Sequence, residues 1–341
     1  MRLIGALLYR HAAKKRWKWS MMLTNRLFYA LKPVMPRTAQ LYFRRMLIRH
    51  KVQSHRHVWP IDYAAGDTPK NWKGWPDGKQ FAFVLSHDVD TQRGHDNVMK
   101  LAELEMNLGF RSSFNFVPER YNLSRQLIDD LWSMGFEVCV HGLNHDGKLF
   151  WSRKIFAERA VKINEYLKDW KSVGFTSPSM HHNLEWMHML NIQHATSTFD
   201  TDPFEPEPDG FGTIFPYWVQ NNHSHRGYVE LPYTIPQDFT LFVLMEETDG
   251  VIWRKKLAWI AENDGMALLN THPDYMNFNG DDKSPEIYPV RFYEDFLLHI
   301  KQEYKGRYWA AKPEDVALFC LKDVSRLNHY PFETISVHGE K

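Results

Sequence analysis

Short apolar runs alternate with stretches of helical periodicity along most of the chain. Apolar runs typical of strands occupy residues 81–86, 112–117, 136–142, 174–179, 194–199, 228–234 and 265–272. Helical spacing of apolar residues falls between them, at about 94–107, 124–134, 151–170, 183–190 and 250–262, and again at 290–304. This alternation predicts parallel β/α units, and seven strands favour an incomplete, distorted (β/α) barrel over an open sheet.

The regions outside this pattern set the expected domain boundaries. Residues 59–80 are dense in Gly, Pro, Asn and Asp, which predicts an irregular linker that enters the first strand. We therefore expect an N-terminal extension over residues 1–58, a barrel over residues 81–325 and a C-terminal tail over residues 326–341.

Charge is distributed unevenly between these regions. The chain has a net charge of +1, yet residues 1–61 contain 14 Lys/Arg and no Asp or Glu. The remaining 280 residues therefore carry 28 basic and 41 acidic side chains, a net charge of −13. The two parts of the chain are expected to have different roles.

The basic extension has three interpretations. Its apolar residues are interleaved with cations at loosely helical spacing, so residues 1–57 could lie on an anionic membrane surface, with Trp17, Trp19, Phe28 and Leu31 inserted. The favoured alternative is an extension, predicted to be helical, that packs an apolar stripe on the barrel and leaves a solvated basic face. Nucleic acid is not expected as a partner, because no groove-reading motif accompanies the charge.

Cysteine content and hydropathy bear on the compartment. The chain contains 2 cysteines, Cys139 and Cys320, which provide no disulfide framework and fit a reducing environment. The apolar stretch 3–9 is short for a signal peptide, and no run of about 18 apolar residues occurs. We expect a cytoplasmic protein and leave open a peripheral contact with the inner membrane surface.

Polar residues follow three of the predicted strands directly. The sequence HDVD at 87–90 ends the first strand, HGLNHD at 141–146 ends the third, and NTH at 270–272 ends the seventh. In β/α barrels the reacting groups project from the carboxyl ends of the strands. The three clusters are therefore expected to face one cavity.

The second cluster has the spacing of a chelating pair. Gly142 and Asn144 disfavour a helix, so a strand followed by a tight turn must bring His141 and His145 together. Two imidazoles and one carboxylate form a common three-ligand site for a catalytic divalent ion. Ordinary loop histidines are the alternative in a chain with 18 His, but the Asp-x-Asp sequence at another strand end weighs against it.

In order and spacing, the sequences SHDVD, VHGLNHD and LLNTH resemble the motifs of the polysaccharide deacetylases, the NodB-homology proteins of carbohydrate esterase family 4. The resemblance covers about residues 75–325 and implies a distorted seven-stranded barrel. It also implies one divalent metal ion, zinc as the first choice, with cobalt, nickel or iron as alternatives.

The resemblance assigns roles to five residues. It implies that Asp88 is the general base and His272 the general acid, and that Asp90, His141 and His145 bind the metal. In extended backbone Asp88 and Asp90 point to the same side, which suits one carboxylate on the ion and one facing its water.

Two positions depart from the family pattern. Thr176 stands where the family has an arginine that steadies the general base. The carboxylate behind the acid histidine is expected to be Asp200, or less probably by position Asp202. His87, Asn144 and Asp200 are the remaining candidates for support of the site or for substrate contact, with His87 not expected to bind metal.

The predicted activity is metal-dependent hydrolysis of a non-peptide C–N bond, with N-deacetylation of an amino sugar in a polysaccharide or its precursor as the first choice. Alternatives are hydrolysis of a small non-sugar amide on the same fold, and a catalytically weak glycan-binding or scaffold protein. Fold alone does not separate them.

Overall fold

The structure, a computed structural model, describes residues 36–207, 210–221, 226–280 and 284–331. Most of the predicted N-terminal arm, including Trp17, Trp19, Phe28 and Leu31, lies outside the described residues, and so does the end of the predicted tail. Within the described part of the chain, no helix is long and apolar enough to cross a membrane.

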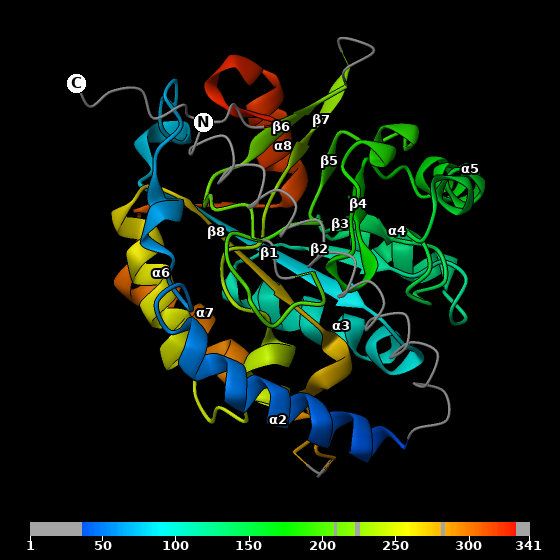
Figure 1. Cartoon of the computed structure of the whole chain (residues 1–341), viewed down its shortest axis with the longest axis vertical. Helices are drawn as coiled ribbons and strands as arrows, with labels where there is room; N and C mark the ends of the chain where they lie inside the picture. Colours follow the sequence, from blue (N-terminus) through cyan, green and yellow to red (C-terminus); the bar gives the residue numbers. More distant parts are fainter. Residues whose placement is uncertain (1–35, 208–209, 222–225, 281–283, 332–341) are drawn as a thin grey trace, which may run out of the picture.

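Seven parallel strands form the centre of the molecule (Figure 1). They are β1 (Phe81–Val89), β2 (Ser113–Phe116), β3 (Glu137–His141), β4 (Gly174–Thr176), β5 (His194–Ala195), β7 (Gly227–Glu230) and β8 (Met266–Thr271). Each corresponds to one predicted strand, although β4 and β5 are shorter than expected. Pro178 has no N–H to donate to the ladder, which accounts for the early end of β4.

The strands curl into an incomplete barrel. Their order is β8-β1-β2-β3-β4-β5-β7, and every neighbouring pair is parallel. The ring closes through a single isolated bridge between Ile235, beyond the end of β7, and Leu269 in β8. All nine residues of β1 are buried, as expected for a parallel strand that is covered on both faces. The predicted distorted seven-stranded (β/α) barrel is thus confirmed.

Helices surround the barrel on its outside. They are α3 (Gln92–Leu108), α4 (Arg125–Ser133), α5 (Arg153–Asp169), α6 (Val251–Glu262), α7 (Arg291–Glu303) and α8 (Pro313–Leu321). Figure 1 shows α6 and α7 on one side of the strands and α4 and α5 on the other. The helix predicted at 183–190 is a short 3₁₀ turn over Trp186–Met189.

Three strands extend the sheet beyond the predicted seven. β6 (Tyr217–Gln220) pairs antiparallel with β7, and β12 (Asn328–Tyr330) pairs with β6. β11 (Tyr308–Ala311) lies beside the first half of β1. Tyr217 and Trp218 of β6 are buried. The predicted tail contributes β12 to the sheet.

The region before the barrel is packed against it. Helix α2 (Arg37–His55) belongs to the predicted extension and covers η6, a π-helical turn over Phe239–Leu244. The linker contains only short 3₁₀ turns at Tyr63–Gly66 and Pro76–Gly78, but its Trp75 is buried in the main core. Residues 37–55 thus pack an apolar stripe on the barrel, which is the favoured alternative for the extension.

Candidate metal and catalytic site

Side-chain alternation along β1 divides its polar residues between two environments. Asp88 accepts hydrogen bonds from Asn115 of β2 and Asn270 of β8, inside the barrel. His87 points to the opposite face, where its ring contacts Glu105 of α3 and Thr271. Asp88 and Asp90 share the inner side, as the Asp-x-Asp spacing predicts.

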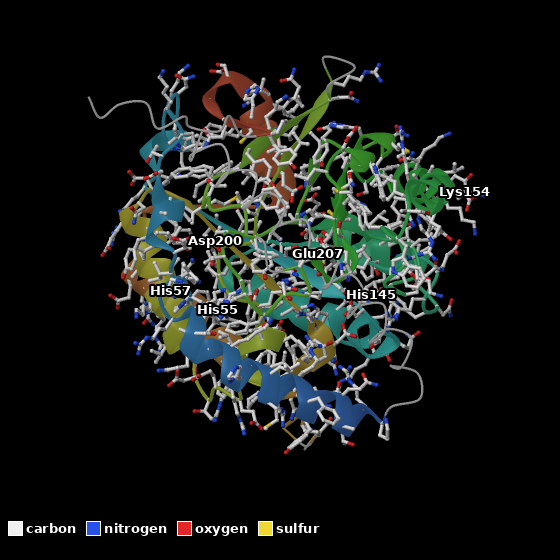
Figure 2. All side chains as sticks on the ribbon, viewed as in Figure 1. His55, His57, His145, Lys154, Asp200 and Glu207 are labelled. Atoms are coloured by element: carbon white, nitrogen blue, oxygen red, sulfur yellow. The ribbon has the colours of Figure 1, made fainter. Side chains whose placement is uncertain are left out.

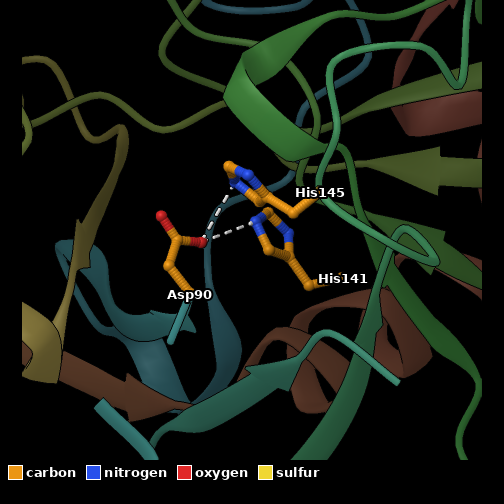
Figure 3. Close-up of side chains that lie close together, drawn as sticks. All are labelled: Asp90, His141 and His145. Atoms are coloured by element: carbon orange, nitrogen blue, oxygen red, sulfur yellow. Dashed lines mark ion pairs between the residues drawn. The ribbon is translucent and has the colours of Figure 1, made fainter. Parts of the chain in front are cut away.

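Asp90, His141 and His145 converge on one point (Figure 3). Oδ1 of Asp90 lies 3.1 Å from Nε2 of His145 and 3.4 Å from Nε2 of His141. The three ligand atoms all lie within 4.8 Å of one another. His141 is buried and the other two residues are half-buried, so the group is accessible from one side. The structure brings together the three residues predicted to bind metal.

The chemistry of these three atoms fits a cation. Nδ1 of His141 lies 3.1 Å from the carbonyl oxygen of Thr176, an acceptor, so Nδ1 carries the proton and the Nε2 lone pair faces Asp90. Oδ1 of Asp90 is buried without a hydrogen-bond partner among the described residues. A carboxylate oxygen and an imidazole lone pair directed at one point suit a divalent ion.

Protonation shifts around this point show the same demand for positive charge. Burial would raise the pKa of Asp90, but His145 and His141 hold it well below its usual range. Burial would lower the pKa of His141, yet Asp88 and Asp90 raise it above the ordinary value. The two carboxylates beside His141 therefore favour a positive charge at this point.

A tight turn after β3 returns His145 to His141. Gly142 has φ +63°, and a Cβ there would lie 2.4 Å from Cγ of Pro178, so the turn requires glycine. His145 itself has φ +51°, an uncommon conformation for a residue with a side chain, and Arg120 donates a hydrogen bond to its carbonyl. Backbone strain at this residue is the cost of directing its ring into the site.

Two carboxamides hold Asp88 where the family pattern has an arginine. Nδ2 of Asn115 lies 2.7 Å from Oδ1 of Asp88, and Nδ2 of Asn270 lies 2.8 Å from Oδ2. Thr176 instead bonds Thr196 through its hydroxyl, at 2.6 Å. The Asp88 carboxylate is therefore oriented by neutral donors, and Nδ1 of His141 lies 3.8 Å from its Oδ1.

His272 follows β8 and has its own carboxylate partner, Asp238. Nδ1 of His272 lies 2.7 Å from Oδ1 of Asp238, and the His272 amide donates to Oδ2 at 2.9 Å. Tyr288 and the Phe239 amide also donate to Asp238. Burial lowers the pKa of His272, but Asp238, Asp90 and Asp88 raise it to about 10. The imidazole is thus held protonated at neutral pH.

The expectation that Asp200 or Asp202 stands behind the acid histidine does not match this geometry. Asp200 forms a buried ion pair with Lys256 of α6, at 2.5 Å, and Figure 2 shows it apart from His145. Asp202 accepts a hydrogen bond from Tyr233. Asp238 could have been found from its position, because it follows the strand predicted at 228–234 as the other site residues follow theirs.

Two further candidates lie outside the site. His87 is fully buried between Glu105 and Thr271, with Tyr293 of α7 also donating to Glu105, so it joins β1 to the surrounding helices. Asn144 donates to Glu119 on the outside of the turn, at 3.3 Å. Neither side chain contacts the converging ligand atoms.

Asp274 is a site residue that the sequence did not suggest. Its Oδ2 accepts from the Asp90 amide at 3.0 Å and its Oδ1 from the Thr91 hydroxyl at 2.5 Å. A Cβ on Gly94 would lie 2.1 Å from Oδ2 of Asp274, so only glycine leaves room for this contact. The carboxylate thereby fixes the backbone that presents Asp90.

The predicted catalytic residues are largely shielded from solvent. Asp88, His141 and His272 are 3%, 1% and 8% exposed. A cavity of about 10 Å³ beside His145, lined by residues that include Leu143, Pro178 and His181, holds no more than a single water molecule. His181 in turn contacts Glu207 at 2.9 Å, in the segment that follows β5.

Solved structures of other proteins share this fold. A Mycobacterium smegmatis protein assigned as a polysaccharide deacetylase superposes with a TM-score of 0.60 at 16% identity, over 80% of this chain and 99% of that one. The PuuE allantoinase gives 0.57 at 13% identity, over 81% and 99%. A Pseudomonas aeruginosa PAO1 protein assigned as a polysaccharide deacetylase gives 0.55 at 15%, over 81% and 100%.

Comparison by sequence adds nothing to this result. No family model matches the chain, and no curated protein matches it significantly. The likeness to the solved structures supports the predicted resemblance to the NodB-homology proteins at the level of the fold.

Proposed function

We propose that this chain is a metal-dependent hydrolase of non-peptide C–N bonds that removes the N-acetyl group from an amino sugar in a polysaccharide or its precursor. The observation that carries the proposal is the convergence of Asp90, His141 and His145 on one point, between a buried carboxylate and a protonated imidazole. Asp88 and His272 supply those two groups.

The ligand set assigns the metal site to Asp90 Oδ1 and the Nε2 atoms of His141 and His145. Zinc is the first choice for such a nitrogen and oxygen set, and cobalt, nickel or iron also fit it. A divalent ion held there would polarise the amide carbonyl and lower the pKa of a bound water molecule.

Asp88 has the surroundings of a general base. Its two oxygens accept from Asn115 and Asn270, which leaves further lone pairs for a water proton. Positioning of such a base within hydrogen-bond reach of the water contributes about 10²–10⁴-fold to the rate.

His272 has the surroundings of a general acid. Asp238 accepts from Nδ1, so the other ring nitrogen remains available to donate its proton to the departing amine. An amide needs this help because its nitrogen leaves poorly without a proton. Opposite environments therefore separate the acid from the base in one small site.

The choice of an acetylated amino sugar rests on structural likeness to the two proteins assigned as polysaccharide deacetylases. A second candidate is a small non-sugar amide. The low exposure of Asp88, His141 and His272 favours this alternative, and the PuuE allantoinase has the same fold with a similar TM-score.

A parallel substrate screen tests the proposal. Zinc-loaded protein should release acetate from N-acetylated oligosaccharides and should lose this activity on addition of a chelator. His145→Ala should be inactive, whereas Asn144→Ala, a neighbouring change outside the site, should retain activity. Turnover of allantoin or another small amide without acetate release from any glycan would replace the sugar substrate. An absence of turnover on every amide, with metal bound, would contradict the hydrolase assignment.

A further inference from the structure

Helix α2 presents two different apolar faces. The inner face buries Leu41 and Ile48, which are 2% and 5% exposed, in a small cluster with Phe239, Val243 and Leu244. The outer face carries four large apolar side chains within six residues. They are Tyr42, Phe43, Met46 and Leu47, which we call the outer stripe, and they are 61%, 56%, 50% and 61% exposed.

Polar contacts fix the orientation of the helix. Nε of Arg45 donates to the Val243 carbonyl at 3.0 Å, and its guanidinium pairs with Glu246 at 2.8 Å. Nε of Arg37 pairs with Glu286 at 2.8 Å. The helix cannot rotate to bury the outer stripe without breaking these contacts and exposing its inner face. Figure 1 shows α2 along the margin of the molecule.

The outer stripe is unusual for a folded surface. Single exposed apolar residues are ordinary, but a contiguous group of large ones marks an interaction surface. Two of the four are aromatic, and Tyr in particular suits an environment that is apolar on one side and wet on the other. The arrangement suits shallow burial in an interface more than burial in a deep pocket.

The charge around the stripe identifies the partner. Helix α2 has no acidic residue. Directly after the stripe, His50 is exposed, and so is Arg49, which pairs with Glu246 at 2.8 Å. Arg56 and His57 follow the helix end and are exposed. The whole segment 1–61 carries 14 Lys/Arg and no Asp or Glu. Apolar side chains surrounded by cations match an anionic bilayer surface, which attracts basic segments and accepts apolar side chains at headgroup depth.

We infer that the outer stripe of α2 docks the protein on an anionic membrane surface. This inference stands independently of the proposed hydrolase activity. Aromatic contacts connect the apolar cluster beneath α2 with His272. The ring centroid of Phe239 lies 4.7 Å from that of Tyr275, and the Tyr275 centroid lies 5.3 Å from that of His272.

Vesicle flotation of the full-length chain tests the inference. Wild-type protein should float with vesicles of phosphatidylcholine that contain about 30% phosphatidylglycerol. It should not float with vesicles of phosphatidylcholine alone. Raising the salt to about 0.5 M should weaken binding because screening shortens electrostatic attraction. Phe43→Glu/Leu47→Glu should lower the partition coefficient at least about tenfold.

A matched variant controls for added charge and lost apolar surface. Val161 of α5 and Leu318 of α8 are 60% and 46% exposed, so Val161→Glu/Leu318→Glu makes the same chemical change elsewhere. This variant should bind like wild type. Equal thermal unfolding temperatures of the two double variants show that lost binding is not lost folding.

Three results would overturn the inference. One is binding by Phe43→Glu/Leu47→Glu that equals wild-type binding. Another is a wild-type protein that is dimeric in solution and does not bind vesicles, together with a monomeric Phe43→Glu/Leu47→Glu variant. This result would assign the stripe to contact with a second copy of the chain. A third is wild-type protein that does not bind vesicles and a Phe43→Glu/Leu47→Glu variant that unfolds at a lower temperature than wild type. This result would assign residues 1–35 as the partner of the stripe.

Discussion

A step of one residue along β1 decides whether a polar side chain faces the candidate site or the surrounding helices. Asp88 faces the barrel interior and its carboxamide partners, whereas His87 faces α3 and α7 and is sealed there. Register supplies the partners, since Asp88 pairs with Asn115 across β2 and Ser86 with Asn270 across β8. A shift by one residue would exchange the two environments.

The two carboxylates of β1 should respond differently to mutation. Asp88→Asn should keep the metal and lose about 10²–10⁴-fold in turnover, because it removes a base and leaves the ligands intact. Asp90→Ala should lose metal affinity, with activity partly recovered in excess ion. Metal content and steady-state kinetics of each variant check this. Metal loss in Asp88→Asn with full occupancy in Asp90→Ala would reverse the assigned roles.

The acid histidine should depend on Asp238 in a pH-dependent way. Asp238 is the largest cause that raises the pKa of His272 to about 10, against the effect of burial. In Asp238→Asn the imidazolium loses its proton at lower pH, so the basic limb of the kcat/KM profile should move down by about one to three pH units. Activity should fall more at pH 8.5 than at pH 6. An unchanged basic limb would show that Asp238 does not control the pKa of His272. The same pH profile of Asp200→Asn tests the carboxylate that the sequence suggested.

At the scale of elements, the junction between β1 and α3 holds Asp90 in place. Asp274, in the 3₁₀ turn after His272, accepts from the Asp90 amide and from Thr91 at the N-terminus of α3. Gly94 in the first turn of α3 lies directly against the same carboxylate. One contact thus joins the end of β1, the start of α3 and the segment after β8.

Gly94→Ala should damage both stability and metal binding. The new Cβ would lie 2.1 Å from Oδ2 of Asp274, so the carboxylate must leave its position, at a cost of about 1–3 kcal/mol in the free energy of unfolding. Chemical denaturation and metal titration measure the two effects. Gly250→Ala is the control, since the nearest atom to its Cβ would be the end of the Arg254 side chain, at 3.4 Å. Equal stability and equal metal affinity of the two variants would contradict the role of the Gly94–Asp274 contact.

A buried ion pair stabilises the opposite end of the barrel. Glu137 at the start of β3 lies 2.7 Å from Nε2 of His194 in β5, and its other oxygen accepts from the Glu314 amide at the N-terminus of α8. Both side chains of the pair are 1% exposed. Burial would raise the pKa of Glu137, but His194 and the other donors lower it below the ordinary value.

Breaking this pair should be costly. His194→Ala leaves a buried carboxylate without its partner, so the free energy of unfolding should fall by about 3–5 kcal/mol at pH 7. The lowered pKa of Glu137 means that its contribution is present above the unfolded pKa, about 4.3, and is lost as pH falls through the folded value. Glu137→Gln/His194→Ala should be less destabilised than the sum of its single changes. Additive losses, measured by denaturation, would contradict coupling.

At the scale of the whole molecule, sequence periodicity predicts most of the architecture. The seven barrel strands and the surrounding helices follow from alternating periods, and the site follows from polar residues at strand ends. The structure brings Asp90, His141 and His145 together and places Asp88 3.8 Å from His141.

The parts that were missed depend on information that local pattern does not contain. The strand β12 lies in the predicted C-terminal tail, and β6 lies in a segment rich in Pro and Gly. The partners of Asp88 depend on strand register, and Asp238 on a π-helical turn that returns it to His272. Such contacts are set by tertiary packing, not by spacing along the chain.

The measurement that tests the account most directly is the binding of Zn²⁺ to metal-free protein, followed by equilibrium titration and elemental analysis. The account predicts one ion per chain for wild type and for Asn144→Ala, and a loss of affinity of at least about 10-fold for His145→Ala and Asp90→Ala. Wild-type protein that binds no divalent ion, or His145→Ala that binds like wild type, would contradict the claim that these three residues form a metal site.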